Sequence, residues 1–248
     1  MRNIQKGQEP ESLTSYRTCR DRGHDGYVDY EDYRSKHGDD LLESLIREQR
    51  GLCCYCMKRI TQESATVEHW YPQSKYKEDR EKNGKNNNPR MLIDLTDHGD
   101  LDYCNLLAVC DGNKKHQREH HHCDASRGNV PLDFNPANRN HNVESRTQFT
   151  NSGKIHPRGE RNPKPGTESE FYKQLDIYLN LNYPRLKNQR KSILDTICKK
   201  IHPHLGTAQG REILTRELKK WNGDSAGDLR PFCQVVVYWI KKRLGIII

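Results

Sequence analysis

The sequence is poor in hydrophobic residues. They make up 32% of its 248 residues, whereas apolar residues, glycine included, form about 45–50% of a typical globular domain. This shortage argues against one large apolar core as the source of stability. Small units that are held together by a metal ion, or that pack on a partner, fit the composition better, because a small core alone is only marginally stable.

Long apolar runs are also missing. No stretch approaches the roughly 18 apolar residues that a membrane-spanning helix needs, and the opening Met-Arg-Asn-Ile-Gln-Lys-Gly lacks the apolar region of a secretory signal. We therefore expect a cytoplasmic protein without a membrane segment. In that reducing compartment the nine cysteines, several of them clustered, indicate zinc binding rather than disulfide bonds.

The charge balance is basic. Lysine and arginine number 42 against 34 acidic residues, which gives a net charge of +8. This excess is consistent with a polyanionic partner such as nucleic acid. An ordinary basic protein has the same balance, so charge alone does not decide between these two interpretations.

The pattern of the chain divides it into four parts. Residues 1–37 form a polar N-terminal arm with several tyrosines, and residues 38–136 form a central unit that contains most of the cysteines. Residues 137–166 predict a hairpin, with its turn at 151–153, and a linker. Residues 167–248 show helical periodicity and predict a mainly α-helical C-terminal region, whose apolar faces we expect to dock on a partner chain.

Local signals predict where several helices begin. An aspartate N-cap and a later glycine predict a helix from about Asp40 to Arg50. In the C-terminal region a capping box at Thr167 and Glu170 opens the first helix, and Pro184 opens the second. The remaining two helices are expected over about Thr207 to Trp221 and from near Pro231.

The cysteines of the central unit predict a structural zinc site. Cys53 and Cys56 have C-x-x-C spacing, which lets one tight turn offer two thiolates to a tetrahedral ion. Cys110 and Cys123 are the second pair, although an insertion separates them and the chain must loop out and return. The competing ligands that the sequence leaves open are Cys54, Cys104, His116 and His122.

An acid-histidine dipeptide lies between the two cysteine pairs. Hydrolysis of a phosphodiester requires a nucleophilic water, a base and a cation that stabilises the developing charge. His69 is the candidate base, because neutral imidazole is available near pH 7. Glu68 points to the opposite side of a strand and can bind a metal ion. Asp124 directly follows a predicted zinc ligand, so the zinc site would fix its position.

Two further polar residues complete this constellation. Arg127 lies three residues after Asp124, on the same helical face, and can grip a phosphate through two hydrogen bonds. Asn105 can hold the ring or the backbone of His69 through its amide.

The order of these motifs resembles the HNH endonucleases with a ββα-metal fold. The residues that carry the resemblance are Cys53 and Cys56, Glu68-His69, Pro72-Gln73-Ser74, Asn105-Leu106 and Cys123-Asp124-Ala125-Ser126-Arg127-Gly128. The resemblance implies an α+β fold, with a zinc-stabilised ββα-metal core between an N-terminal arm and helix and a mainly α-helical C-terminal region. It implies His69 as general base, Glu68 and Asp124 as ligands of a catalytic divalent ion, and Asn105 as the residue that holds His69. Cys110 and Cys123 would complete the zinc site.

The sequence departs from the family pattern in two places. An insertion splits the last cysteine pair, which puts the assignment of Cys110 in doubt. The third signature position is Asp124 rather than asparagine or histidine. Because aspartate is a good ligand for Mg²⁺ or Mn²⁺, we retain catalysis and leave the preferred metal open between these two.

Longer stretches resemble the PtuB family, the HNH effectors of Septu-type anti-phage systems that also occur beside some retrons. The stretches are residues 4–10, 67–74, 101–113 and 122–129. This resemblance implies a PtuA-like ATPase as partner and nucleic acid as substrate, with DNA favoured over RNA. The expected function is thus a metal-dependent HNH endonuclease. The alternative is a non-catalytic zinc module that binds nucleic acid or serves as an adaptor.

Overall fold

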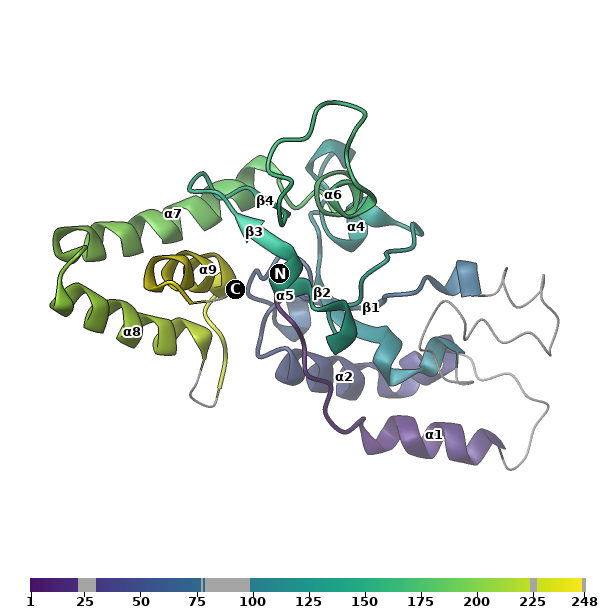
Figure 1. The fold of residues 1–248 in the computed structure, drawn as a ribbon. Coiled ribbons are helices and arrows are strands. Elements are labelled where there is room, and N and C mark those ends of the chain that lie inside the picture. Colours follow the sequence, from purple (N-terminus) through teal and green to yellow (C-terminus); the bar gives the residue numbers. More distant parts are fainter. Residues whose placement is uncertain (22–29, 77, 79–98, 224–226, 247–248) are drawn as a thin grey trace.

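A computed structural model of the chain describes residues 1–21, 30–76, 78, 99–223 and 227–246. These residues form a mixed α+β structure with two small antiparallel sheets (Figure 1), so the predicted α+β class is confirmed. No helix in the described part of the chain is long and apolar enough to cross a membrane.

Helices dominate the described residues. The longer α-helices are α1 (Glu11–Asp21), α2 (Tyr30–Glu48), α7 (Pro184–Ile201), α8 (Ala208–Asn222) and α9 (Cys233–Leu244). The short helices are α4 (Asp124–Arg127), α5 (Val143–Arg146), α6 (Glu170–Lys173) and the π-helical turn η7 (Gln174–Tyr178). The 3₁₀ turns are η1 (Gln62–Ser64), η3 (Gly99–Leu101), η4 (Tyr103–Asn105), η5 (Arg118–His120), η6 (Arg139–His141) and η8 (His202–His204).

The central sheet positions the candidate site. Strand β1 (Ala65–His69) pairs antiparallel with β2 (Leu106–Cys110), so that Ala65 lies opposite Cys110 and His69 opposite Leu106. Every residue of β2 is buried, because α2 packs against the sheet. This register places Cys110 at one end of the sheet and His69 at the other. Helix α4 follows β2 later in the chain.

The helix expected from about Asp40 begins ten residues earlier, at Tyr30. It therefore runs through the predicted boundary between the arm and the central unit. Glycine is a poor helix former, and Gly38 precedes two aspartates that look like caps. Tyr33, Leu41 and Leu45 are nevertheless fully buried and share one helical face at four-residue spacing. Their packing outweighs the local signal.

The C-terminal predictions agree with the structure except at one cap. The hairpin forms from β3 (Thr147–Phe149) and β4 (Ile155–Pro157), and α7 begins at Pro184 as expected. The first helix, however, begins at Glu170 with Ser169 as its cap, whose hydroxyl accepts a hydrogen bond from the Tyr172 N–H at 3.1 Å. The expected capping box at Thr167 is therefore wrong, because the chain turns once more before the helix.

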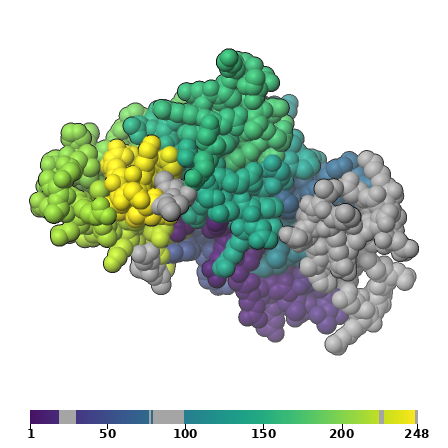
Figure 2. Space-filling model, viewed as in Figure 1, coloured from purple at the N-terminus to yellow at the C-terminus, as the bar shows by residue number. Residues whose placement is uncertain are grey.

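The apolar faces of the C-terminal helices pack within the chain. Helix α9 is buried along residues 233–240 and contacts α7, α8 and β3, as the ribbon shows (Figure 1). The space-filling view shows these helices packed directly against the middle of the chain (Figure 2). Among the described residues, only Val130, Ile177, Leu205 and Ile246 are large hydrophobic side chains classed as exposed. These faces therefore stabilise the fold itself.

Candidate metal centre and acid-histidine site

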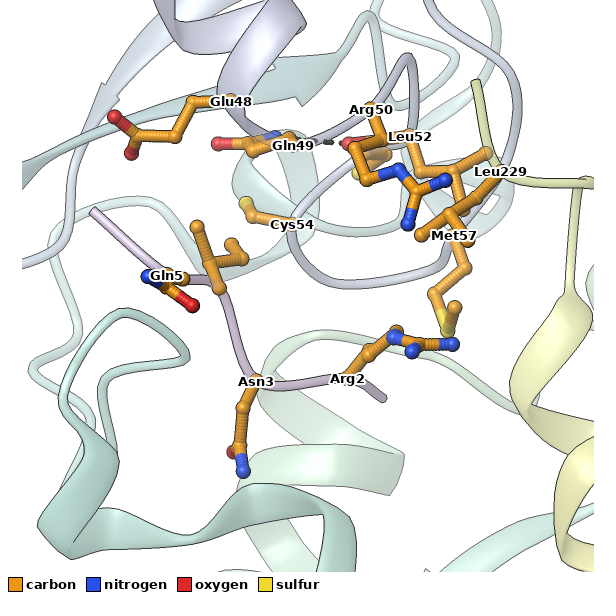
Figure 3. Close-up of a pocket in the computed structure, with 12 residues that line it drawn as sticks. Arg2, Asn3, Gln5, Glu48, Gln49, Arg50, Leu52, Cys54, Met57 and Leu229 are labelled. Carbon is orange, nitrogen blue, oxygen red and sulfur yellow. Dashed lines mark hydrogen bonds between the residues drawn. The ribbon is translucent and has the colours of Figure 1, made fainter. Parts of the chain in front are cut away.

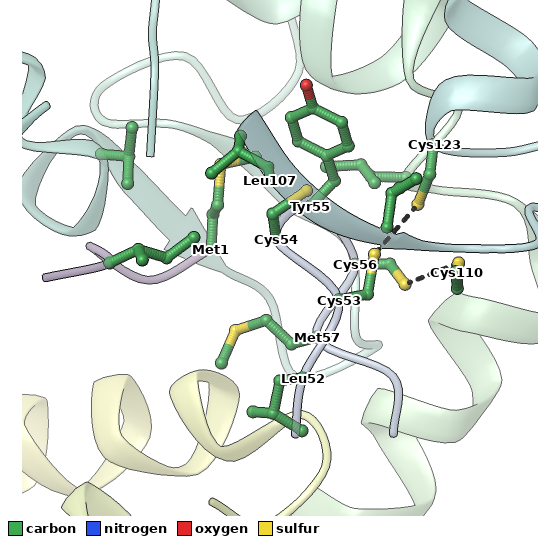
Figure 4. Close-up of a cluster of buried hydrophobic side chains, with 14 of the residues drawn as sticks. Met1, Leu52, Cys53, Cys54, Tyr55, Cys56, Met57, Leu107, Cys110 and Cys123 are labelled. Atoms are coloured by element: carbon green, nitrogen blue, oxygen red, sulfur yellow. Dashed lines mark hydrogen bonds between the residues drawn. The ribbon is translucent and has the colours of Figure 1, made fainter. Parts of the chain in front are cut away.

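Four buried cysteines converge at the end of the central sheet where Cys110 lies (Figure 4). The sulfur atoms of Cys53, Cys56, Cys110 and Cys123 all lie within 4.8 Å of one another. Cys53 and Cys123 sulfurs are 3.9 Å apart, and Cys56 and Cys110 sulfurs are 3.7 Å apart. A tetrahedral zinc ion with Zn–S bonds of about 2.3 Å separates its sulfur ligands by about 3.8 Å. The cluster thus has the donor type and the size that zinc requires, and it can hold such an ion.

The competing ligands lie outside this cluster. Cys104 is exposed, and His116 is exposed in the loop before η5. Cys54 is buried but is not one of the four grouped cysteines, and like Cys53 it lines a hollow of about 230 Å³ between the N-terminal segment and the end of α2 (Figure 3). His122 is adjacent rather than distant: its Nδ1 is 3.2 Å from the Cys123 sulfur and 3.9 Å from that of Cys110.

The insertion returns the chain to the cluster through a constrained turn. Gly112 has a φ of +58°, and a Cβ there would lie 2.3 Å from the His122 carbonyl oxygen. Cys123 itself has a φ of 55°, which costs a non-glycine residue about 1–3 kcal/mol. Its N–H donates to the Leu179 carbonyl at 2.8 Å. The fold therefore holds Cys123 in a strained conformation that points its sulfur at the other three.

Glu68 is buried beside a cationic partner. Its side chain is 5% exposed, and its Oε1 lies 3.0 Å from Arg127 Nη1. The Tyr55 hydroxyl donates to the same oxygen at 3.1 Å. Burial raises the pKa of Glu68 well above its ordinary 4.5, and the charge of Asp124 raises it further although Arg127 opposes the shift. Burial thus disfavours the charged form of Glu68, and the positive charge of Arg127 favours it.

Asp124 shares this site from α4. Its carboxyl is within hydrogen-bonding reach of Glu68, and Lys114 Nζ lies 2.8 Å from its Oδ2. Burial alone would raise the pKa of Asp124, but the hydrogen bonds to Glu68 and Lys114 outweigh it and hold the pKa below its ordinary value. Of the two carboxyl groups, Asp124 is therefore the one that carries the negative charge most readily.

His69 is fixed at the end of β1. Its Nε2 lies 2.9 Å from the Asp100 carbonyl oxygen, and Tyr30 packs edge-on with ring centroids 4.5 Å apart. A carbonyl oxygen can only accept, so Nε2 carries the proton and Nδ1 keeps its lone pair. Burial lowers the pKa of His69 to about 4. The ring is therefore neutral at pH 7 with Nδ1 as a proton acceptor.

Asn105 fixes the backbone after His69 rather than the ring. Its Oδ1 accepts from the Tyr71 N–H at 2.7 Å, and its Nδ2 donates to the Tyr71 carbonyl at 3.2 Å. Its own carbonyl accepts from the Trp70 N–H at 2.9 Å. These three bonds set the path of the chain as it leaves β1. Of the two roles expected for Asn105, the structure shows a hold on the backbone.

Arg127 lies inside the site, where its side chain is 2% exposed. Besides Glu68, the guanidinium donates to the carbonyls of His69 at 2.9 Å and Trp70 at 3.0 Å and to the Tyr55 hydroxyl at 3.1 Å. The sequence prediction assigned it to a phosphate, and these contacts assign it to the frame that holds the acid-histidine dipeptide.

Three contributors to the site were not anticipated from the sequence. Tyr55 lies between the two cysteines of the C-x-x-C pair, where an aromatic residue suggests only packing. Lys114 belongs to the insertion, and Asp100 contributes a main-chain carbonyl that no side-chain pattern reveals. Only the tertiary contacts identify these three residues.

Comparison with models of known protein families finds no match, and comparison with curated proteins finds none either. The functional interpretation therefore depends on the residues and their geometry.

Proposed function

We propose that this chain is a zinc-stabilised HNH-type endonuclease that hydrolyses phosphodiester bonds and depends on Mg²⁺ or Mn²⁺. The observation that carries the proposal is a neutral, fixed His69, whose Nδ1 is free of a proton, next in sequence on β1 to Glu68, whose carboxyl is within hydrogen-bonding reach of Asp124 on α4. The order of strands β1 and β2 and helix α4 along the chain supports a ββα-metal core as part of this proposal.

The residues present fit a divalent ion. Glu68 and Asp124 offer oxygen ligands of the kind that Mg²⁺ and Mn²⁺ prefer, and because burial raises the pKa of Glu68, a bound cation would favour its anion. When bound, the ion would stabilise the charge that develops on the phosphate and the leaving oxygen. The Lys114 ammonium at Asp124 marks where a cation is favoured.

In this proposal His69 acts as the general base. Nδ1 accepts the proton of the attacking water, while the bond from Nε2 to the Asp100 carbonyl keeps the ring oriented and stabilises the imidazolium that forms. Arg127 and Asn105 act as positioning residues, because they hold the backbone of residues 69–71. We propose DNA as the favoured substrate and RNA as the second.

A cleavage assay on supercoiled DNA and on RNA, with Mg²⁺ or Mn²⁺, tests the mechanism. His69→Gln keeps a side-chain N–H that can reach the Asp100 carbonyl but removes the base, and we expect cleavage to fall by about 10²–10⁴-fold. Added imidazole should restore part of the activity of His69→Ala. His116→Ala, at an exposed histidine outside the site, is the matched control. Normal cleavage by His69→Gln at unchanged zinc content would refute the mechanism.

One observation favours the alternative of a non-catalytic zinc module. Both carboxyl groups already have a cationic partner, Arg127 for Glu68 and Lys114 for Asp124. A site of this kind can be a purely structural ion-pair network. Nucleic-acid binding without cleavage under every divalent ion and with every activator would favour this alternative.

We propose a PtuA-like ATPase as partner on the strength of the resemblance in residues 4–10, 67–74, 101–113 and 122–129 alone. Because the apolar faces of the C-terminal helices pack within the chain, the proposed contact would use polar surface. Co-purification of the two chains in low and high salt tests this, since a polar interface weakens as salt screens its charges. Failure of the chains to associate at low salt would contradict the proposal.

A further inference from the structure

A basic cavity lies between the β3–β4 hairpin and α9, on residues that the proposed catalysis does not use. It consists of two adjoining hollows of about 260 Å³ and 150 Å³. The residues that line both hollows are Phe149, Thr150, Asn151, Tyr238 and Lys242. Together the hollows reach the size of the smaller ligand pockets, which begin at roughly 300 Å³.

The charge of this cavity is of one sign. Arg161 and Lys242 line the larger hollow, Lys242 and Arg243 line the smaller, and neither lining includes a carboxylate. Within the described part of the chain, no acidic side chain forms an ion pair with any of these three cations. Three uncompensated cations around one hollow favour an anionic ligand.

The smaller hollow is aromatic and apolar. Tyr238 and Trp239 line it together with Leu194 and Val235, and the Arg243 guanidinium covers one face of the Trp239 ring at 3.4 Å from its centroid. Trp239 is 4% exposed, and its indole Nε1 has no hydrogen-bond partner among the described residues. The hydrogen-bonding capacity of this N–H is therefore unused among the described residues.

The larger hollow adds a buried acceptor. His156 lines it and is 4% exposed. Its Nδ1 lies 2.8 Å from the Pro157 carbonyl oxygen, so Nδ1 carries the proton and Nε2 keeps a lone pair. The residues that line this cavity thus combine cations and aromatic rings with an indole N–H that lacks a partner and an imidazole nitrogen that keeps its lone pair.

We propose that this cavity binds a nucleotide, with its phosphate at Arg161 and Lys242 and its base in the aromatic hollow. A nucleotide combines the three features that the lining requires: an anionic group, a flat ring that packs against aromatic side chains, and both donors and acceptors on that ring. The nucleotide can be a free mononucleotide or the end of a strand, and the two share this chemistry. The site shares no residue with Glu68, His69 or Asp124, so it stands independently of the proposed nuclease.

Calorimetric titration of the full chain, without divalent ions, tests the proposal with adenosine monophosphate, adenosine, inorganic phosphate and a short terminally phosphorylated single strand. Adenosine monophosphate should bind at least about tenfold more tightly than adenosine, since hydrogen bonds to charged groups contribute that much. Adenosine binding as tightly as its monophosphate, or no binding of any probe, overturns the proposal. A strand that binds more tightly than the mononucleotide assigns the site to strand ends, and the reverse assigns it to free nucleotides.

Substitutions place the ligand in the cavity. Lys242→Ala and Arg161→Ala should each weaken the binding of adenosine monophosphate about tenfold, and Trp239→Phe, which keeps a ring but removes the N–H, about fivefold. Lys242 and Arg161 are exposed, so the chain tolerates their loss. Lys241→Ala, at the adjacent lysine of α9 outside both linings, should leave affinity unchanged. Equal losses in Lys241→Ala and Lys242→Ala would mean that only general charge matters and would overturn the site.

Discussion

The change in stability on replacing Arg127 by alanine distinguishes two roles for this residue, support of the site's framework and binding of a phosphate. The guanidinium is the cationic partner of buried Glu68 and donates to two main-chain carbonyls and a phenol. Removing one partner of a buried ion pair costs about 3–5 kcal/mol. An exposed phosphate contact, by contrast, would leave stability within about 0.5 kcal/mol when truncated.

The part of this destabilisation that comes from Glu68 has an upper bound that depends on pH. Glu68 can escape the loss of its partner by taking up a proton, which costs at most about 3.4 kcal/mol at pH 7 for a carboxyl of ordinary pKa 4.5, and less because burial already raises the pKa of Glu68. At pH 5 the same protonation costs only about 0.7 kcal/mol. Most of the remaining loss comes from the orphaned carbonyls of His69 and Trp70. The destabilisation by Arg127→Ala should therefore be smaller at pH 5 than at pH 7, by at most about 2–3 kcal/mol.

Thermal unfolding of the zinc-loaded chain at both pH values measures this effect. For a chain of this length each kcal/mol shifts Tm by about 2–4 °C, so Arg127→Ala should lower Tm by roughly 6–20 °C at pH 7 and clearly less at pH 5. Arg118→Ala, at an exposed arginine in η5, is the control and should change Tm by at most about 2 °C. A loss below about 2 °C for Arg127→Ala at pH 7 would refute the framework role, and a loss equal at both pH values would show that Glu68 is already protonated at pH 7.

Two further predictions concern the zinc cluster and His69. Metal analysis should find that Cys123→Ser loses stoichiometric zinc and that His122→Ala retains it. Cys104→Ser is the control and should also retain zinc. The opposite result for Cys123 and His122 would make the histidine the ligand. The folded pKa of His69 is about 4 against an ordinary 6.5, so its neutral form is favoured in the folded state. Stability should therefore fall as pH drops from about 6.5 to 4, by about 3 kcal/mol. His69→Gln should lack this component in pH-dependent unfolding, and equal slopes for both proteins would contradict the pKa assignment.

Much of the local structure could be predicted because it depends on neighbouring residues. Proline at the start of α7 and the Asn-Ser-Gly turn of the hairpin act within one turn of the chain, and both predictions agree with the structure. The start of α2 could not be predicted in this way, because buried Tyr33 stabilises a helix that continues past Gly38.

The same distinction between local and tertiary causes applies to the candidate site. The sequence by itself determined the C-x-x-C pair, the acid-histidine dipeptide and the aspartate after Cys123, since spacing along the chain sets which residues can act together. Only the tertiary structure decided the partners. It closed the cysteine cluster across an insertion, turned Arg127 inward onto Glu68, left Asn105 on the backbone and brought Lys114 to Asp124. The physical reason is that buried charges and hydrogen-bonding groups require partners, and packing rather than spacing supplies them.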